Sequence, residues 1–181
     1  MPLATPLGSD ATPSGAVFSP CQTYRYVLWR VWDAQKPWVL FLGLNPSTAD
    51  GTRNDPTCRR CIGYARSWGY GGVYVANLFA YRATHPRDLK AAENPVGPET
   101  DDWICILNRR AHRVIMAWGN HGSFLGRDRL VLPLLTQPHC LALTKSGHPA
   151  HPLYLEKSLQ PMVWCPQGEP VATQSPVVCQ D

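Results

Sequence analysis

Four apolar runs in the sequence each end in a segment of polar and glycine residues that could contact a ligand. The segments are GLNPSTAD, ANLFAYRAT, WGNHGS and TKSGHPAHPLY. Amide and imidazole side chains can donate and accept hydrogen bonds, so they are suited to reading the edge of a polar ligand or to orienting a water molecule. The amide and imidazole residues in these segments are Asn45, Asn77, Asn120, His121, His148 and His151.

Each of these residues also has a purely structural interpretation. An Asn that precedes Pro, as Asn45 does, commonly caps its own turn. Asn77 interrupts the apolar run GVYVANLF, where an unpaired amide costs roughly 1 to 3 kcal/mol, so it must bond to neighbouring backbone or face a ligand. His148 and His151 lie beside Pro and Gly, which is typical of surface loops.

The cysteines and histidines do not favour a metal, redox or disulfide site. His148 and His151 have no Cys or carboxylate beside them at zinc-finger spacing. Cys58 and Cys61 form a CxxC pair on an expected helix, and an iron–sulfur role would need other cysteines in arbitrary combinations, so buried or unreactive thiols are favoured. The seven cysteines are an odd number at irregular spacings, which fits reduced thiols. We expect no metal, no cofactor and no disulfide.

The alternation of apolar strands and amphipathic helices predicts how the candidate residues are positioned. It predicts an α/β fold, a three-layer α/β/α sandwich around a central, mainly parallel four-stranded sheet. TYRYVLWRVWD followed by PWVLFLGL predicts an N-terminal hairpin that leads into the central strand. Ligands of such sheets bind outside the carboxyl ends of the strands, so the polar residues would gather at one rim.

The clearest helix signal is DPTCRRCIGYARSWG. Asp55 would be the N-cap, Pro56 would occupy the first helical position, and the helix would end near Gly69. Further helices are expected in PRDLKAAEN, GPETDDWICILNRRAH and GRDRLVLPLLTQ, the last of which Pro133 would kink or shorten.

The composition indicates one globular domain, because 44% of the 181 residues are hydrophobic and 17% are charged. We place this domain at residues 20–165, between mobile tails at residues 1–19 and 166–181 that are rich in Pro, Ser and Thr. No apolar run reaches the roughly 18 residues of a membrane span, and the first residues lack the pattern of a signal peptide. We therefore expect a cytoplasmic monomer that contacts no membrane. The net charge of +4 permits a polyanionic partner without requiring one.

Taken in order, the four motifs resemble those of the uracil-DNA glycosylase superfamily, in particular its mismatch-specific and single-strand-selective branches. GLNPS is similar to the first motif of that superfamily, and VYVANLFAYR to its second strand with the base-reading Asn. VIMAWGNHG is similar to the strand that ends in a glycine turn, and GHPAHPLYL to the His-Pro motif of the DNA-penetrating loop. The chain also resembles a group of bacterial and phage proteins with the same GLNPS and HPLY landmarks. The resemblance covers residues 38–155.

The resemblance implies a role for each matching residue. Asn45 would hold the water that attacks C1′ of the sugar, where the most active branch has an Asp, and an amide cannot accept the proton of that water, so turnover would be slow. Asn77 would read the Watson–Crick edge of a flipped base. Either His151, which we favour, or His148 would donate a hydrogen bond to the pyrimidine O2. The residues that would border the base are Leu44, Ser47 and Phe79.

The resemblance also implies a contact surface for single- or double-stranded DNA. An apolar wedge would take the place of the extruded nucleotide, formed by Pro149, Pro152 and Leu153. Polar and basic side chains would contact the DNA backbone. These side chains belong to Ser47, Thr48, Arg53, Arg59, Arg60 and Lys145.

Ser47 bears on the substrate. The uracil-strict branch carries a Tyr at this position beside C5 of the pyrimidine, and a Ser would leave that space open. We therefore expect a DNA glycosylase-like hydrolase that flips out and excises a C5-substituted pyrimidine and leaves an abasic site, in DNA repair or in defence against phage. Two alternatives stay open. One is an enzyme that acts on free modified nucleosides or nucleotides, and the other is a non-catalytic module that binds a modified base, suggested by Asn45 in place of an acid.

Overall fold

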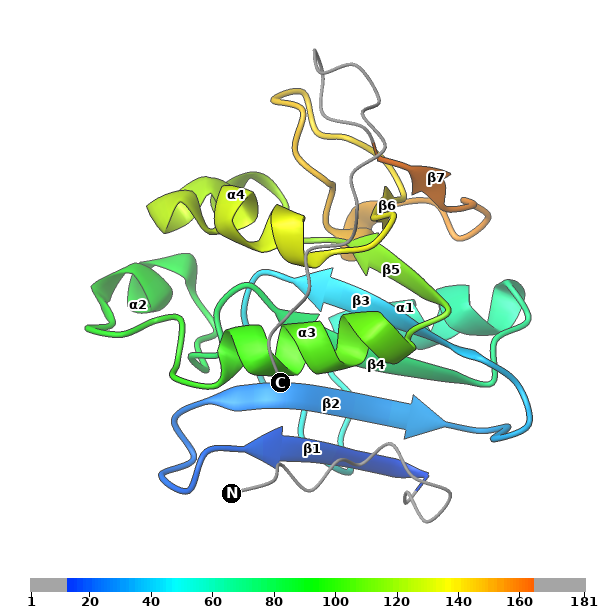
Figure 1. Ribbon diagram of the computed structural model, residues 1–181, viewed down its shortest axis with the longest axis horizontal. Helices are drawn as coiled ribbons and strands as arrows, with labels where there is room; N and C mark the ends of the chain where they lie inside the picture. Colours follow the sequence, from blue (N-terminus) through cyan, green and yellow to red (C-terminus); the bar gives the residue numbers. More distant parts are fainter. Residues whose placement is uncertain (1–12, 165–181) are drawn as a thin grey trace.

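The computed structural model describes residues 13–164, and these residues form a mixed α/β fold (Figure 1). The general α/β class expected from the sequence is confirmed. One seven-stranded sheet runs in the order β1-β2-β4-β3-β5-β6-β7. Its strands are β1 (Ser14–Phe18), β2 (Arg25–Val31), β3 (Trp38–Gly43), β4 (Gly72–Asn77), β5 (Arg113–Met116), β6 (His139–Cys140) and β7 (Met162–Val163). The helices are α1 (Pro56–Ser67), α2 (Pro86–Ala91), α3 (Thr100–Arg110) and α4 (Arg127–Val131), with 3₁₀ turns η1 (Asn120–Gly126), η2 (Leu132–Leu134) and η3 (Pro152–Tyr154).

The sheet is wider than the expected four strands because strands at both edges join it. β3 pairs in parallel with β4 on one side and β5 on the other, and β6 pairs in parallel with β5. The pairs β1–β2, β2–β4 and β6–β7 are antiparallel. The central strand β3 is therefore enclosed by backbone hydrogen bonds on both sides, which fixes where its carboxyl end lies.

The expected hairpin between residues 23–33 and the central strand is wrong. β2 pairs with β1 and with β4, so β4 lies between β2 and β3. The expected boundary of the N-terminal tail at residue 19 is also wrong, because Ser14–Phe18 is a strand held by backbone pairing to β2. The sequence SGAVF is too short and too small in its side chains to signal this pairing. The expected C-terminal tail at residues 166–181 lies outside the described residues.

Helix α1 forms for the local reasons seen in the sequence. The Asp55 side chain accepts a hydrogen bond of 2.7 Å from the backbone N–H of Cys58, and Pro56 occupies the first turn, where its missing N–H costs nothing. The chain leaves the helix at Gly69, whose φ of 82° is the left-handed conformation that glycine adopts without strain. This helix is confirmed at both ends.

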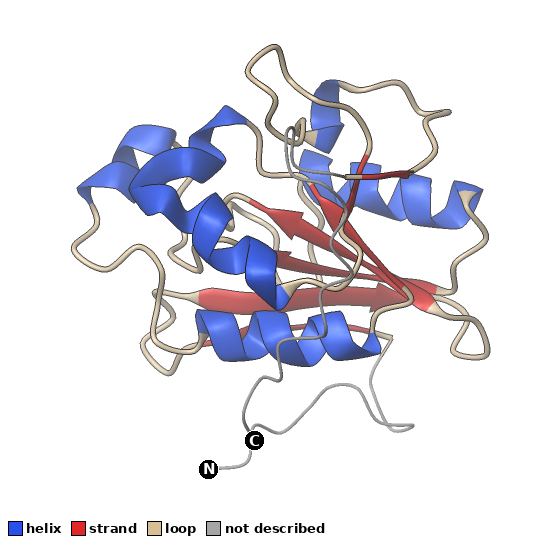
Figure 2. Ribbon diagram, turned by 45° about the horizontal axis from the view of Figure 1, so that its top comes forward, coloured by secondary structure: helices blue, strands red, loops and turns tan. Residues whose placement is uncertain are grey.

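Helices cover both faces of the sheet (Figure 2). On one face α1 packs against the odd-numbered residues of β3, such as Phe41, and on the other α3 packs against even-numbered residues such as Leu42. This alternation follows from the two-residue period of a strand. In Figure 1, α3 lies in front of the sheet and α1 behind it. The last expected helix ends early at Val131, and Pro133 lies in the 3₁₀ turn that follows, as its sequence predicts.

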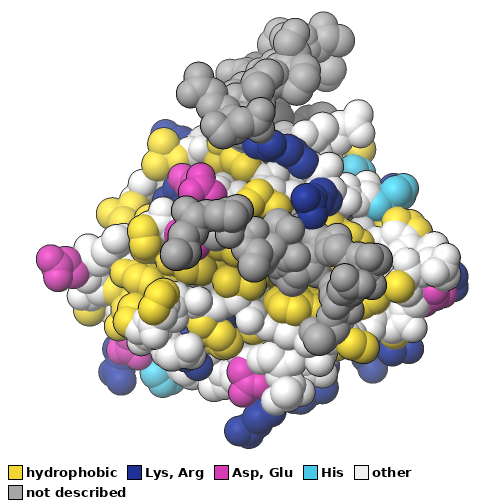
Figure 3. Space-filling model, turned by 60° about the horizontal axis from the view of Figure 1, so that its bottom comes forward, with side chains coloured by type: hydrophobic (Ala, Val, Ile, Leu, Met, Phe, Trp, Pro, Cys, Tyr) yellow, Lys and Arg dark blue, Asp and Glu magenta, His cyan; other side chains and the backbone are white. Residues whose placement is uncertain are grey.

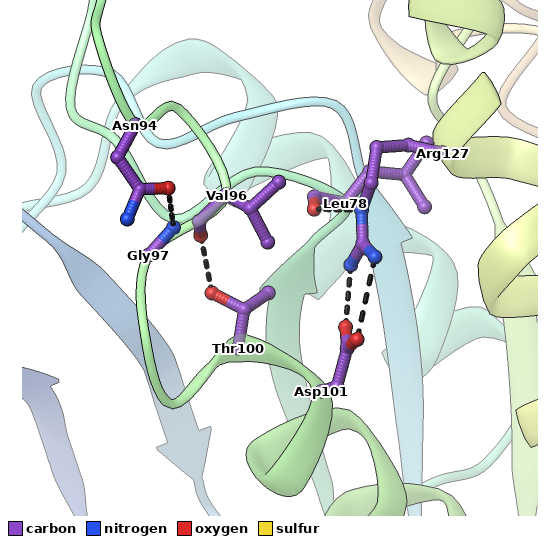
Figure 4. A network of polar contacts seen from close by, with 7 residues as sticks. All are labelled: Leu78, Asn94, Val96, Gly97, Thr100, Asp101 and Arg127. Carbon is purple, nitrogen blue, oxygen red and sulfur yellow. Dashed lines mark hydrogen bonds and ion pairs between the residues drawn. The ribbon is translucent and has the colours of Figure 1, made fainter. Parts of the chain in front are cut away.

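A buried arginine joins α4, α3 and the end of β4 (Figure 4). Arg127 is only 4% exposed, and its guanidinium donates to Asp101 Oδ1 at 2.5 Å and to the Leu78 carbonyl at 3.1 Å. At the start of α3, Thr100 Oγ1 donates to the Val96 carbonyl. Because Leu78 directly follows the last residue of β4, this contact holds the carboxyl end of that strand.

We expect Asp101→Ala to lower the free energy of unfolding by about 2 kcal/mol, because it leaves the buried Arg127 charge without its carboxylate partner. The loss is smaller than for a fully buried pair, since the Asp101 side chain is 54% exposed. Urea unfolding measures it. The control is Asp102→Ala, one residue further along α3 and exposed, and an equal loss in both variants would contradict the assignment.

Candidate functional site

A cavity of about 780 Å³ lies at the carboxyl ends of β3, β4 and β5. Its walls come from these strand ends, from the start of α1 and from the loop that contains His151. Several residues singled out in the sequence lie together in these walls. They are Leu44, Asn45, Ser47, Asn77, Asn120, His121, His151 and Pro152.

Asn77 contributes a buried amide to the cavity wall. It is 5% exposed, and its Nδ2 has no hydrogen-bond partner among residues 13–164. An unpaired buried donor costs roughly 1 to 3 kcal/mol, so this position is unfavourable unless a ligand or an ordered water accepts the bond. Gly43 is the register partner of Asn77 in the parallel pair β3–β4, and a Cβ on Gly43 would lie 2.8 Å from Asn77 Oδ1. Because Gly43 has no side chain, there is room beside it for the Asn77 amide.

We expect Gly43→Ala to displace the Asn77 amide and to lower ligand turnover or affinity at least tenfold. The new methyl group would come within 2.8 Å of the amide oxygen, which is closer than contacts of real Cβ atoms. Gly63→Ala on α1, where an added Cβ meets nothing within 4 Å, is the matched control. Unchanged affinity in Gly43→Ala would show that the position of Asn77 does not matter.

Asn45 is oriented by two backbone carbonyls. Its Nδ2 donates to the carbonyl of Ala83 at 2.8 Å and to that of Pro46 at 3.1 Å. Both of these bonds use Nδ2, and the side chain lines the cavity. With Nδ2 engaged, the group left for a ligand is Oδ1, an acceptor that can hold a water molecule but cannot take its proton.

His151 lines the cavity, and one of its two ring nitrogens is engaged by the backbone. Its Nδ1 accepts from the backbone N–H of Leu153 at 3.3 Å, so the ring proton of the neutral form is on Nε2. Burial lowers the pKa of His151 below its ordinary value of 6.5, and the nearby Asp55 carboxylate opposes this only in part. The ring is therefore neutral at pH 7.

We expect ligand turnover to stay constant above pH 7 and to fall on acidification below pH 6.5, through the lowered pKa of His151. Protonation at Nδ1 removes the acceptor for the Leu153 N–H, and the folded state then loses the stability that the neutral buried ring contributes above its unfolded pKa. A pH–rate profile measures this. His151→Gln should lack the acid limb, and an identical limb in that variant would assign it to another group.

One protein family matches most of the chain. The family described as protein of unknown function (DUF1643) matches residues 25–153. The chain belongs to this family. No curated protein and no solved structure matches the chain. The family match begins at Arg25 and ends at Leu153, so it includes Asn45, Asn77 and His151.

The structure of this DUF1643 chain separates the two histidine alternatives. His148 lies outside the cavity lining, with its Nδ1 3.8 Å from Asp128 Oδ2, whereas His151 lies in the lining. The expected contact of Phe79 with a base is wrong. Phe79 is fully buried in the core on the α3 face, with its ring centroid 5.5 Å from that of Phe124, so the ring is not available to a ligand.

The prediction that Pro149 and Pro152 form an apolar wedge in this DUF1643 chain is also wrong. Pro149 and Pro152 are buried, and the Pro149 carbonyl accepts from the Gly119 N–H at 2.8 Å, because this loop packs against the end of β5. Leu153 is half-buried. Tyr154, 87% exposed beside the cavity, is the large side chain that projects into solvent there.

The expected DNA contacts divide into exposed and engaged side chains. Thr48 and Arg53 are exposed and line a shallower hollow of about 620 Å³ that shares Ser47 with the cavity. Arg60 instead donates to the Pro152 carbonyl at 3.2 Å, so it ties α1 to the His151 loop. Lys145 is exposed, and Arg59, also exposed, donates from Nη1 to the Asn54 carbonyl at 2.7 Å.

Sequence reasoning missed two charged residues of the cavity, Arg25 and the carboxylate of Asp55, which it treated only as a helix cap. A charged side chain within the apolar pattern of TYRYVLWRVWD was the available signal for Arg25.

Trp118 also lines the cavity, and its Nε1 has no partner among residues 13–164.

Within residues 13–164, no group of three His, Cys, Asp or Glu side chains could hold a metal ion. The five cysteines described there are free. Cys58 and Cys61 line the cavity, but burial raises the pKa of the Cys58 thiol to about 11 and that of Cys61 well above 9.0, so both are protonated at neutral pH. No helix within the same residues is long and apolar enough to cross a membrane.

Proposed function

We propose that this DUF1643 chain is a DNA glycosylase-like hydrolase that excises a flipped, modified pyrimidine and leaves an abasic site. The observation that carries the proposal is Asn77, a buried amide with an unpaired donor in the wall of a cavity at the strand ends. A flipped base would supply the missing acceptor through its Watson–Crick edge. The order of the motifs, similar to that of the uracil-DNA glycosylase superfamily, supports the same activity.

The sheet topology supports this placement of the ligand. β4, β3, β5 and β6 pair in parallel in that order, with α1 and α3 on opposite faces, which fits the proposed three-layer α/β/α arrangement. The chain leaves β3 towards β4 and leaves β5 towards β6, so the connections diverge between β3 and β5. Open α/β sheets bind ligands at such a divergence, outside the carboxyl ends of the strands.

Three side chains would divide the reaction between them. Asn77 Nδ2 donates to a carbonyl of the base, and His151 Nε2–H donates to a carbonyl oxygen on which negative charge develops as the glycosidic bond breaks. Asn45 Oδ1 accepts a hydrogen bond from the water that attacks C1′. The C1′–N bond breaks with its electron pair going to the base, the water oxygen bonds to C1′, and solvent takes the proton that the amide cannot accept.

The size of the cavity and Ser47 in its wall favour a base with a substituent at C5. Such a substrate would place the protein in DNA repair or in defence against phage, as a cytoplasmic monomer acting on DNA. The β1–β2–α3 side of the described surface shows acidic and basic side chains interspersed with apolar ones (Figure 3). DNA would approach where the hollow lined by Thr48 and Arg53 adjoins the cavity, since the two share Ser47 in their walls.

Asn45 also favours a second candidate, a module that binds a modified base without cutting the glycosidic bond, because an amide cannot accept the proton of an attacking water. A panel of end-labelled oligonucleotides separates the two candidates. It contains uracil, thymine mismatches, hydroxymethylated pyrimidines and their glucosylated forms, and alkali cleaves any abasic site. Strand breaks at one modified base support the hydrolase. Binding without breaks on every member of the panel supports the module.

A further inference from the structure

Arg25 is a buried cation in the cavity wall that the proposed reading of the base does not use. It is 4% exposed, and its Nη1 donates to the Ala49 carbonyl at 2.6 Å. Its Nε has no hydrogen-bond partner among residues 13–164. A guanidinium buried with an unpaired N–H is costly, so a ligand group in the cavity would relieve part of that cost.

A β-bulge aims Arg25 at the cavity. Val17 pairs with Val27, but the next residue, Phe18, pairs with Arg25, so Tyr26 is the extra residue in β2. Without the bulge Tyr26 would share the α1 face of the sheet with Leu28, and Arg25 would face α3. With it, Tyr26 lies in the core on the α3 side and Arg25 lines the cavity with Leu28. Bulges beside binding sites commonly redirect one side chain in this way.

Asp55 provides the opposite charge in the same cavity. Its Oδ1 is held by the N–H of Cys58 at the start of α1, which fixes the carboxylate in place. Arg25 and Asp55 form no ion pair within 4.0 Å, although burial lowers the pKa of Arg25 to about 10 and the Asp55 charge partly offsets this. The two charges therefore face the same space without neutralising each other by contact.

The charged pair adds to the groups that would hold the base. Arg25 comes from β2, the neighbour of the strand β4 that carries Asn77, and Asp55 lies at the start of α1. The cavity of about 780 Å³ has the size of pockets that hold drug-sized ligands, so it has room for more than one flat pyrimidine ring. Apolar side chains such as Phe41 and Val75 also line it. A ligand that fills this cavity is therefore larger than a pyrimidine base.

We infer that the ligand carries a neutral, hydroxyl-bearing extension that accepts a hydrogen bond from Arg25 and donates one to Asp55. An anionic extension would be repelled by Asp55 and a cationic one by Arg25, whereas a hydroxyl group serves both. The inference rests on the proposed function and narrows its substrate to pyrimidines with a hydroxyl-rich substituent, such as a sugar joined through a hydroxymethyl group.

Binding of free nucleosides tests this inference without requiring catalysis. The probes are deoxycytidine, 5-hydroxymethyldeoxycytidine and its glucosylated form, titrated calorimetrically into the wild-type protein and two variants. Asp55→Ser keeps a good N-cap but withdraws the carboxylate, and Arg25→Lys keeps the charge but removes the planar donor group. The wild-type protein should prefer the glucosylated form over deoxycytidine at least tenfold. Each variant should reduce this preference to less than threefold, with melting temperatures recorded to show that it folds.

Equal affinity of the wild-type protein for all three nucleosides would overturn the inference. A uniform loss for all three in Asp55→Ser would overturn it too, because it would show that Asp55 acts elsewhere in the cavity. The oligonucleotide panel decides the proposed function separately. If the protein excises bases but binds all three nucleosides equally, the proposed hydrolase activity stands and the proposed hydroxyl-bearing extension is rejected. If it prefers the glucosylated nucleoside, loses this preference in Asp55→Ser and excises no base, the extension stands and the hydrolase activity is rejected.

Discussion

Asn45→Ala is expected to lower the rate of base excision by about a hundredfold or more, because it removes the acceptor that positions the attacking water. The variant also loses the bonds from Nδ2 to the carbonyls of Ala83 and Pro46. We therefore expect the free energy of unfolding to fall by about 1 to 2 kcal/mol, which leaves the protein folded under assay conditions. Single-turnover excision of the best base in the panel measures the rate, and urea unfolding measures the stability.

The control for Asn45→Ala is Ser67→Ala at the other end of α1, which removes one hydrogen bond, to the Tyr64 carbonyl, far from the strand ends. It should leave excision unchanged. If Asn45→Ala excises as fast as the wild-type protein, Asn45 does not hold the water and is only the turn former that its position before Pro46 suggests.

Asn77→Ala is expected to separate function from stability. Removing the amide abolishes the donor that reads the base, so excision should fall by about a hundredfold to a thousandfold. The same change relieves an unpaired buried Nδ2, which offsets the small cavity that it leaves. We expect the free energy of unfolding to stay within about 1 kcal/mol of the wild-type value, as for groups kept for function at a cost in stability.

Asn108→Ala is the matched control, since Asn108 is also a buried amide but has partners. Its Oδ1 accepts from the Thr136 N–H at 3.0 Å and its Nδ2 donates to Thr136 Oγ1 at 3.3 Å. This variant should lose about 1 to 3 kcal/mol of stability and retain excision. A large loss of stability in Asn77→Ala, with excision intact, would show that Asn77 is a structural residue.

The helices could be predicted from the sequence because their signals are local. Asp55 and Pro56 define the start of α1 within two residues, and Pro133 predicts that the last helix is short. The polar residues after each parallel strand could be predicted to gather, because parallel strands end at the same edge. The structure places Asn45, Asn77 and His151 in one cavity accordingly.

The rest depends on contacts between distant segments. The pairing of β2 with β4, and not with β3, is decided by which edge of β4 is free, and no local pattern in residues 23–44 contains this. The bulge that directs Arg25 into the cavity depends on the partner strand β1, which the sequence did not reveal. The resemblance implied that Phe79 borders the base, since an aromatic ring can stack on a base. Its side chain belongs instead to the core on the other face.

The most direct test of the proposed activity is mass spectrometry of what the protein releases from DNA that contains hydroxymethylated and glucosylated pyrimidines. The wild-type protein should release one free modified base, with an equal number of abasic sites in the DNA, and Asn77→Ala should release little or none. Release of nucleosides or nucleotides in place of a base, or tight binding with no release, would contradict hydrolysis of the glycosidic bond.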